Sequence, residues 1–176
     1  MPAIPAGLSA VPEVGDFLSL WQRVLDWDAA AGLTPLNGPH TVLVVTDGGL
    51  RRMTPCDVSD PFVVDEQLQR TVLRRHVIPE TVAAADARFS AGGRVTSLDG
   101  GEVTLGTLGD DPQFSFGDGL AGPARPVAVQ SADVTAYTVE MPFVNCSEVS
   151  DAIGRHPQTN PFAPPELPVP EPAPRQ

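Results

Sequence analysis

The chain has 176 residues and a net charge of −11, and all eleven of its basic residues are arginine. The acidity argues against nucleic acid as a partner, because affinity for nucleic acid comes largely from basic residues that neutralise phosphates. The lack of lysine excludes Schiff-base chemistry and a phosphate-binding loop that depends on a lysine. No run of about 18 apolar residues is present, so the sequence predicts no transmembrane helix.

The first 15 residues are predicted to form an extension to one domain over residues 16–155. They lack a basic region followed by a continuous apolar stretch, the features of a secretory signal peptide. We therefore expect a cytoplasmic protein if Met1 is the natural start, and a secreted or cell-surface protein if a leader was removed.

The domain is predicted to open with a helix over residues 16–31. Asp16 stands where a side chain can cap the first turn, and Gly32 stands where a glycine commonly ends a helix. Apolar residues recur between them at helical spacing and define one face to be buried: Phe17, Leu20, Trp21, Val24 and Leu25.

Residues 41–45 (TVLVV) are apolar or β-branched throughout, which is typical of a strand covered on both faces. They lead through Thr46 and Asp47 into a short helix predicted to end near Met53. Asp47 is expected to cap this helix by accepting hydrogen bonds from its free N–H groups, although it could instead act as a general base.

A longer helix is predicted to begin at Asp60 and to end before His76. Asp60 can cap it, and Pro61 suits the first helical position because no N–H partner is needed there. Charged residues near the two ends match the helix dipole: Asp65, Glu66, Arg70, Arg74 and Arg75.

The second half of the chain has the pattern of short strands. Residues 94–98 and 102–108 flank Asp99-Gly100-Gly101, a turn sequence that predicts a hairpin. Residues 109–126 are rich in glycine, aspartate and proline, and we expect them to form an inserted loop that could act as a lid. Two more strands and a short helix are predicted at 126–133, 136–144 and 147–155.

From residue 156 to residue 176 the composition is dominated by proline. Such a segment is expected to be extended and to pack no core of its own. It is either a docking peptide or spacer, or a leftover linker. Phe162 and Leu167 could hold part of it against the domain.

Two sequence boxes, in this order and at this spacing, resemble the fasciclin-domain family. Residues 41–50 (TVLVVTDGGL) are similar to a family box that begins TVFAPT, and residues 75–80 (RHVIPE) to one that reads YHVVPG. The likeness covers about residues 16–146 and would make the chain a divergent bacterial member. It implies an α+β fold in which N-terminal helices pack on a β-rich C-terminal half, built as a two-sheet wedge.

The resemblance also points to candidate binding residues. In animal members the tyrosine–histidine pair of the second box is associated with adhesion, and Arg75 and His76 occupy that position here. Asp47 belongs to the first box, and the predicted loop adds Phe114 and Phe116 as apolar side chains. The expected partner is a protein or a hydrophobic small molecule.

Three residues are candidates for acid–base catalysis: His76, Glu140 and Tyr137. His76 follows a helix end and has Glu80 nearby in sequence, so the two could move a proton; alternatively its ring satisfies backbone groups within the fold. Glu140 lies near Tyr137 in an apolar strand, where it could act as an acid inside a cavity, or be solvated on the opposite face.

Cys56 and Cys146 could form a disulfide if the protein is exported, and otherwise each is expected to be a small buried residue. Two thiols with no neighbouring histidine or cysteine cluster cannot complete a tetrahedral zinc site. The three histidines lie far apart in the sequence. We expect neither a metal nor a cofactor.

The sequence leaves two functional hypotheses. The first is a non-catalytic fasciclin-like binding or adhesion module for a protein, glycan or lipid ligand. The second is an intracellular pocket enzyme of a bacterial, polyketide-like pathway that catalyses cyclisation, dehydration or isomerisation without a cofactor. A deep apolar pocket that holds a buried carboxylate or histidine would favour the enzyme.

Overall fold

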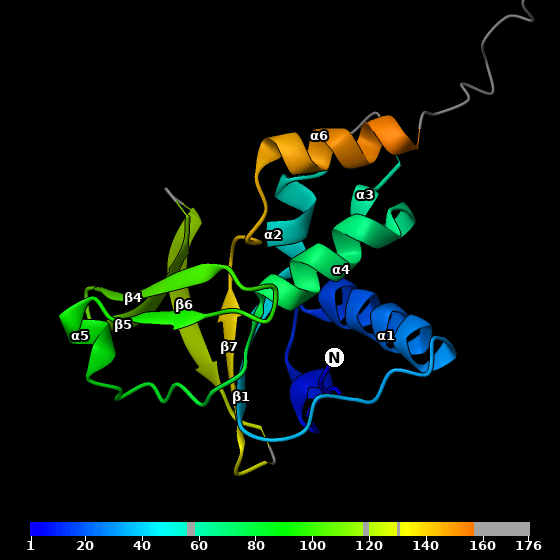
Figure 1. The fold of residues 1–176 in the computed structure, drawn as a ribbon. Helices are drawn as coiled ribbons and strands as arrows, with labels where there is room; N and C mark the ends of the chain where they lie inside the picture. Colours follow the sequence, from blue (N-terminus) through cyan, green and yellow to red (C-terminus); the bar gives the residue numbers. More distant parts are fainter. Residues whose placement is uncertain (56–58, 118–119, 130, 157–176) are drawn as a thin grey trace, which may run out of the picture.

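The computed structural model describes residues 1–55, 59–117, 120–129 and 131–156, and it confirms a mixed α+β fold. Its helices are η1 Leu8–Ala10, α1 Gly15–Ala30, α2 Asp47–Arg52, α3 Pro61–Val64, α4 Glu66–Arg75, α5 Arg88–Ala91 and α6 Cys146–Arg155. Its strands are β1 His40–Val45, β2 Val77–Ile78, β3 Arg94–Thr96, β4 Glu102–Leu108, β5 Asp111–Phe116, β6 Leu120–Val127 and β7 Val134–Val139. Figure 1 shows α1, α4 and α6 on one side of β1 and β7, with β4, β5 and β6 on the other.

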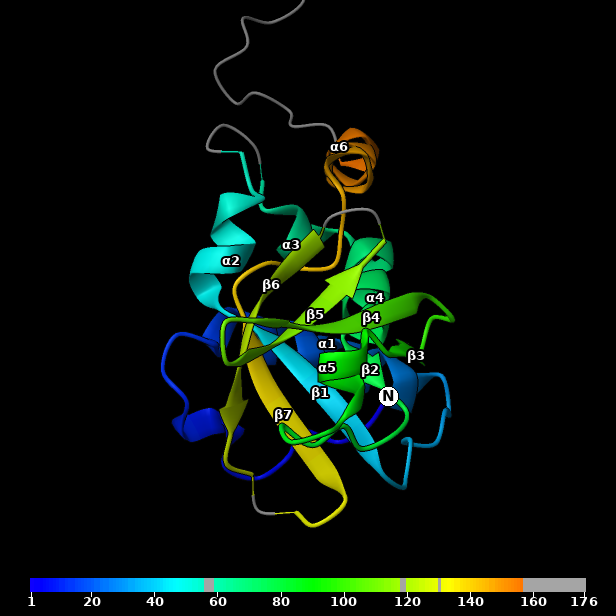
Figure 2. The same ribbon diagram turned by 90° about the vertical axis from the view of Figure 1, so that its left-hand side faces the viewer.

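The seven strands form one sheet in the order β2-β1-β7-β6-β5-β4-β3. β1 and β7 run in parallel, side by side in Figure 2, and every other neighbouring pair is antiparallel. β6 joins the two halves, because residues 120–123 pair with β5 and residues 124–127 pair with β7. The sheet nearly closes, since the N–H of Leu98 after β3 donates to the carbonyl of Val77 in β2 at 2.7 Å. The two-sheet wedge stays a prediction.

The first predicted helix is confirmed as α1, but Asp16 does not cap it. The N-cap position is Val14, which has no capping side chain, and the N–H of Asp16 donates instead to the Asp47 carboxylate at 2.9 Å. Gly32 ends the helix as predicted, with a φ of +70° that disfavours other residues. The carbonyl of Asp28 accepts the N–H of Leu33 just beyond it.

β1 is buried along its whole length, as its composition predicts. The cap of α2 is Thr46, whose hydroxyl accepts from the N–H of Gly49, so the predicted capping role of Asp47 in this helix is wrong. The side chain of Asp47 caps α1 from outside, because a carboxylate is favoured at a helix start. Gly49 has no room for a larger residue: an added Cβ would lie 2.1 Å from the carbonyl oxygen of Glu140.

The long helix predicted from Asp60 is two helices. Asp60 caps α3 and Pro61 is its first residue, as predicted. Asp65 then leaves the helical conformation, with φ −100° and ψ 104°, and caps α4 by accepting from the N–H of Leu68 at 2.6 Å. The break occurs because the Asp65 carboxylate, which is buried, bonds Arg155 of α6 at 2.7 Å as well.

The predicted hairpin is confirmed as β3 and β4, but the predicted lid over residues 109–126 is wrong. This segment forms β5 and most of β6. Gly109 and Gly117 mark turns in this segment, since they have φ of +65° and +57°. Between them Pro112 and Phe114 are buried in alternation with more exposed residues, which is the pattern of a strand with one covered face.

Both ends of the described chain pack against the domain. The predicted N-terminal extension contributes Leu8 and Val14 to the core, and the indole N–H of Trp21 donates to the Pro2 carbonyl at 2.9 Å. The last predicted helix is confirmed as α6, where Asn145 and Glu148 form a capping box. The strand predicted to run to residue 144 ends at Val139. Phe162 and Leu167 of the proline-rich tail lie outside the described residues.

Candidate functional site

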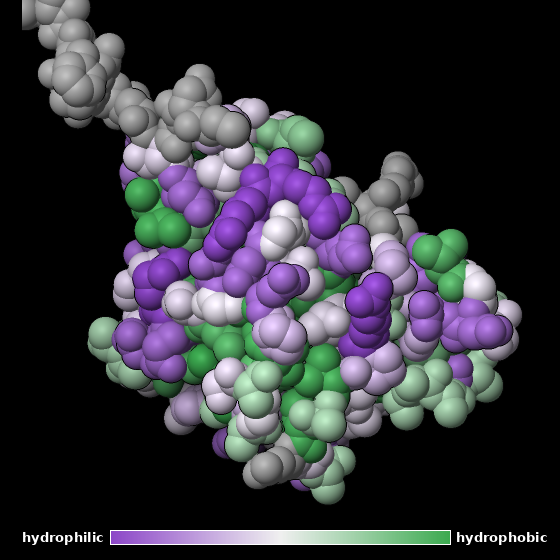
Figure 3. Space-filling view, turned by 180° about the vertical axis from the view of Figure 1, so that it is seen from behind, coloured by the Kyte–Doolittle hydropathy of each residue, from purple (hydrophilic) through white to green (hydrophobic). Residues whose placement is uncertain are grey.

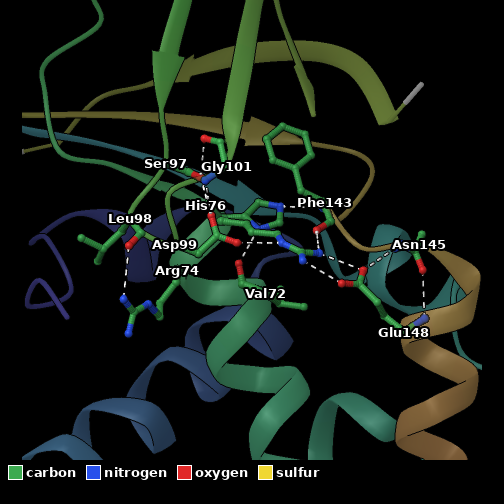
Figure 4. A network of polar contacts seen from close by, with 11 residues as sticks. Val72, Arg74, His76, Ser97, Leu98, Asp99, Gly101, Phe143, Asn145 and Glu148 are labelled. Carbon is green, nitrogen blue, oxygen red and sulfur yellow. Dashed lines mark hydrogen bonds and ion pairs between the residues drawn. The ribbon is translucent and has the colours of Figure 1, made fainter. Parts of the chain in front are cut away.

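Arg75, in the last turn of α4, joins four parts of the chain. Its Nε donates to Asp99 Oδ2 at 2.9 Å, and its two terminal nitrogens lie 2.8 and 2.7 Å from the carboxylate oxygens of Glu148. Nη1 also donates to the carbonyl of Phe143 at 3.2 Å. Figure 4 shows Asp99 and Glu148 approaching this point from the β3–β4 turn and from α6. One guanidinium therefore holds α4, the turn, the segment after β7 and α6 together.

The charges of this Arg75 cluster stabilise one another. Hydrogen bonds to Glu148 and then to Asp99 raise the pKa of Arg75, and the bond from Arg75 lowers the pKa of Glu148. Burial works to raise the pKa of Asp99, but hydrogen bonds from Ser97, the Gly101 N–H and Arg75 lower it on balance. All three groups are charged at neutral pH, so the cluster acts as a structural clamp.

Aromatic rings stack against one another next to the Arg75 cluster. The Arg75 guanidinium carbon lies 5.0 Å from the centre of the Phe116 ring, within cation–π range. Phe116 stacks on Phe143 at 5.5 Å, and Phe143 stacks on His76 at 4.7 Å. The structure therefore brings together three of the predicted binding residues, Arg75, His76 and Phe116, in one packed column.

His76 is fully buried and uses both ring nitrogens. Nδ1 lies 2.7 Å from the carbonyl of Val72, to which it must donate, and Nε2 accepts the N–H of Phe143 at 3.1 Å. Burial lowers the pKa of His76 to about 4. A neutral ring with both nitrogens bonded matches the expectation that His76 satisfies backbone groups, and it leaves no nitrogen free to move a proton.

Tyr137 and Phe114 lie in the core. The Tyr137 hydroxyl donates to the carbonyl of Val82 at 2.8 Å, and burial raises the pKa of this phenol to about 12. The ring of Phe114 is fully buried between Phe89 and Tyr137, at 5.3 and 5.1 Å. Neither side chain reaches the surface, so their positions give no support to roles in catalysis or binding.

Glu140 and Asp47 lie apart from this core. The Glu140 carboxylate is about half exposed and lies 3.7 Å from Arg52, and Asp47 is engaged with the start of α1. Within the described ranges, no hydrogen bond or ion pair connects Glu140 with His76 or Tyr137. The predicted catalytic residues are therefore not assembled into one site.

The cysteines and the possible metal ligands also form no assembled site among the described residues. Cys146 is exposed at the first residue of α6, so the expectation that it is a buried small residue is wrong. Cys56 lies outside the described residues, and the disulfide stays a prediction. In the part of the chain that the structure describes, no group of three or more His, Cys, Asp or Glu side chains could hold a metal ion. In that same part, no helix is both long and apolar enough to cross a membrane.

Two open hollows flank α4. The α4 hollow, of about 630 Å³, is lined by Glu66, Gln67, Arg70, Thr71, Arg74, Arg75 and Asp99. The α1–α4 hollow, of about 490 Å³, lies between the end of α1, the loop after it and α4; its lining residues are Met1, Val24, Asp28, Leu33, Thr34, Pro35, Leu36, Asn37, Arg70, Arg74 and Leu98. Figure 3, which shows the molecule from behind the view of Figure 1, has hydrophobic residues at the surface below an arc of hydrophilic ones.

The sequence named Arg75 and His76 but missed most of their partners. The pattern around Asp99 predicts only a turn, and no motif indicates a role for Glu148 or Phe143 beside Arg75. The spacing of Asn145 and Glu148, typical of a capping box, is the one local signal that could have drawn attention to this region. Arg74 was noted only as a basic residue near a helix end.

These observations define an α+β domain whose candidate surface lies along α4. Among solved structures, the fold is similar to that of a FAS1 domain pair from the insect cell adhesion molecule fasciclin I, with a TM-score of 0.50 and 14% sequence identity. The similarity covers 72% of this chain and 44% of that chain, so this chain spans less than half of that structure. No protein-family model matches the sequence, and no curated protein matches it. At this identity the likeness shows the fold alone: it supports the expected fasciclin-like fold, and membership of the family as a bacterial protein stays a prediction.

Proposed function

We propose that the chain is a non-catalytic binding module that recognises a protein, glycan or lipid ligand. The observation that carries this proposal is the similarity of its fold to domains of a cell adhesion molecule. A fold alone does not determine function, so the arrangement of the side chains must also be consistent with a binding module.

The positions of the predicted acid–base side chains are consistent with a non-catalytic module. The residues that could act as acids or bases have structural partners: His76 is bonded at both nitrogens, Tyr137 is bonded in the core, and Glu140 is exposed beside Arg52. A pocket enzyme would need at least one such group free inside a cavity. No observation favours that alternative.

The α4 side is the surface we propose for recognition. The Arg75 cluster fixes α4 relative to the β3–β4 turn and α6, so the groups around the two hollows are held in place before a ligand binds. Preorganisation of this kind lowers the entropic cost of binding. Thr71 lies on this surface and lines both the α4 hollow and a smaller groove between α4 and α6.

The test measures binding of the full chain to panels of extracellular proteins, glycans and phospholipid vesicles, and recovers each ligand for mass spectrometry. We expect saturable binding within one panel, with the ligand chemically unchanged. Thr71→Arg should weaken it about tenfold by filling the α4 hollow, and Thr107→Arg, the same change at an exposed position of β4, should not. Conversion of a ligand, or no binding in any panel, would contradict the module. If Thr71→Arg and Thr107→Arg change binding equally, the recognition surface does not lie along α4.

A further inference from the structure

Arg74 differs from the arginines on either side of it in α4. Arg70 pairs with Asp28 and Glu66, and Arg75 pairs with Asp99 and Glu148. Arg74 is exposed, and within the described ranges the one hydrogen bond that its side chain makes goes to the carbonyl of Leu98 at 3.3 Å. Figure 4 shows its side chain extending away from the cluster toward Leu98.

Arg74 has no carboxylate partner within the described ranges, although the chain has 22 acidic residues against 11 basic ones. The guanidinium presents several N–H donors in a planar fork that suits a carboxylate, and one weak bond to a carbonyl leaves most of them open. Arg74 is therefore a position where a carboxylate from outside the chain can bind.

The surroundings of Arg74 are apolar as well as positive. The α1–α4 hollow has two guanidiniums, of Arg70 and Arg74, and a single carboxylate, Asp28, which Arg70 already binds. Its side-chain charge is thus positive in a protein of net charge −11. Apolar side chains form much of the remaining wall: Val24, Leu33, Pro35, Leu36 and Leu98. Leu33 exposes 57% of its surface there, although it is a large hydrophobic residue.

We propose that the α1–α4 hollow binds the carboxyl terminus of a partner polypeptide whose last side chain is apolar. Arg74 holds the terminal carboxylate, and the last side chain lies against Leu33 and Leu98. This inference rests on the proposed function, since it names the partner class of a binding module. Capture of a C-terminal carboxylate is an established mode of peptide recognition.

A peptide end fits the hollow better than a fatty acid does. An alkyl chain is bound best by an enclosed and mostly apolar cavity. Here the hollow is open, and Thr34 and Asn37 place polar groups among the apolar ones. Such groups suit the amides that precede a peptide's last residue, whereas an alkyl chain would leave them without partners.

The experiment titrates the ¹⁵N-labelled full chain with a blocked pentapeptide that ends in leucine and has a free carboxyl terminus. The matched probes are the same peptide with a carboxamide end, and decanoate. We expect amide shifts confined to residues that line the hollow, such as Leu33, Thr34, Leu36, Asn37, Arg74 and Leu98, with the carboxamide about tenfold weaker because it loses a charged hydrogen bond. Equal binding of acid and amide, or shifts elsewhere on the chain, would overturn the site; tighter binding of decanoate would overturn the peptide as its occupant.

A pair of variants separates the role of Arg74 from a general effect of charge. Arg74→Gln should weaken the peptide about tenfold, while its side chain can still donate to Leu98. Arg125→Gln is the control, because Arg125 is also exposed and has no ion pair within the described ranges. If the two variants bind the peptide with equal affinity, Arg74 does not hold its terminal carboxylate.

The outcomes of the two experiments remain distinguishable. If the peptide fails to bind but a protein, glycan or lipid binds unchanged, only the carboxylate site is wrong. If the peptide binds as expected but the chain converts a ligand of the panels, the proposed function fails while the site stands.

Discussion

Two consecutive arginines at the end of α4 have opposite surroundings. The side chain of Arg75 is 17% exposed and has two carboxylates, a carbonyl and an aromatic ring as partners. Arg74 is exposed, contacts one carbonyl and borders both hollows. Successive helical residues point about 100° apart, so one faces the sheet and α6 while the other faces solvent. The comparison shows that a basic residue near a helix end can serve structure or recognition, depending on the face it occupies.

The largest effect is expected from removing the buried member of the pair. Arg75→Ala should lower the free energy of unfolding by about 3 kcal/mol, because Asp99 and Glu148 are left as partly buried charges without a cation. Urea unfolding at pH 7 measures it. Arg75→Lys keeps the charge but not the planar set of guanidinium donors, so the free energy of unfolding should fall by less than in Arg75→Ala. A loss below about 1 kcal/mol for Arg75→Ala would mean that the cluster behaves as an ordinary surface ion pair.

A smaller effect should follow from acidification, through His76 at the base of the cluster. Its pKa is about 4 in the folded chain, against 6.5 as the ordinary value, so the unfolded chain binds the extra proton first. The contribution of neutral His76 to the free energy of unfolding is therefore complete above pH 6.5 and is lost as the pH falls toward 4. Between pH 6.5 and 5 the free energy of unfolding should fall by about 1.5 kcal/mol.

Urea unfolding at several pH values in this range tests the prediction, with His76→Gln as the control that removes the titrating group. The slope of stability against pH should flatten in this variant. The carboxylates of Asp99 and Glu148 have lowered pKa values and lose their contribution at lower pH, below this window. An unchanged slope in His76→Gln would show that another group is responsible.

The smallest effect is expected at the exposed member of the pair. Arg74→Ala should change the free energy of unfolding by no more than about 0.5 kcal/mol, since it removes one exposed and long hydrogen bond. The same urea measurement at pH 7 checks it. A loss as large as that of Arg75→Ala would remove the distinction between the two residues.

The parts of the fold that the sequence predicts are those with local signals. The periodicity of α1, the glycine after it, the buried composition of β1 and the turn at Asp99 are each readable within a few residues. The break between α3 and α4 at Asp65 cannot be predicted from nearby residues, because Arg155, the partner of the Asp65 carboxylate, lies 90 residues away. The strands over residues 109–126 were missed because their glycines and prolines suggest a loop until the pairing with β4 and β7 is known.

The candidate site shows the same limit. The family boxes drew attention to Arg75 and His76, but the roles of these residues come from distant partners. Glu148 is 73 residues from Arg75, and the N–H that His76 accepts belongs to Phe143, 67 residues away. No local pattern distinguishes Arg74 from Arg75, since both are basic residues in the last turn of one helix.

The parallel pairing of β1 with β7 has a consequence for how the chain folds. His40 is aligned with Val134 and Val45 with Val139, so the most buried strand meets its neighbour only when nearly all of the domain has been synthesised. Contacts between such distant segments slow folding, because a long loop must close before they form. Until then β1 has an open edge of apolar residues, the kind of segment that chaperones shield on a growing polypeptide.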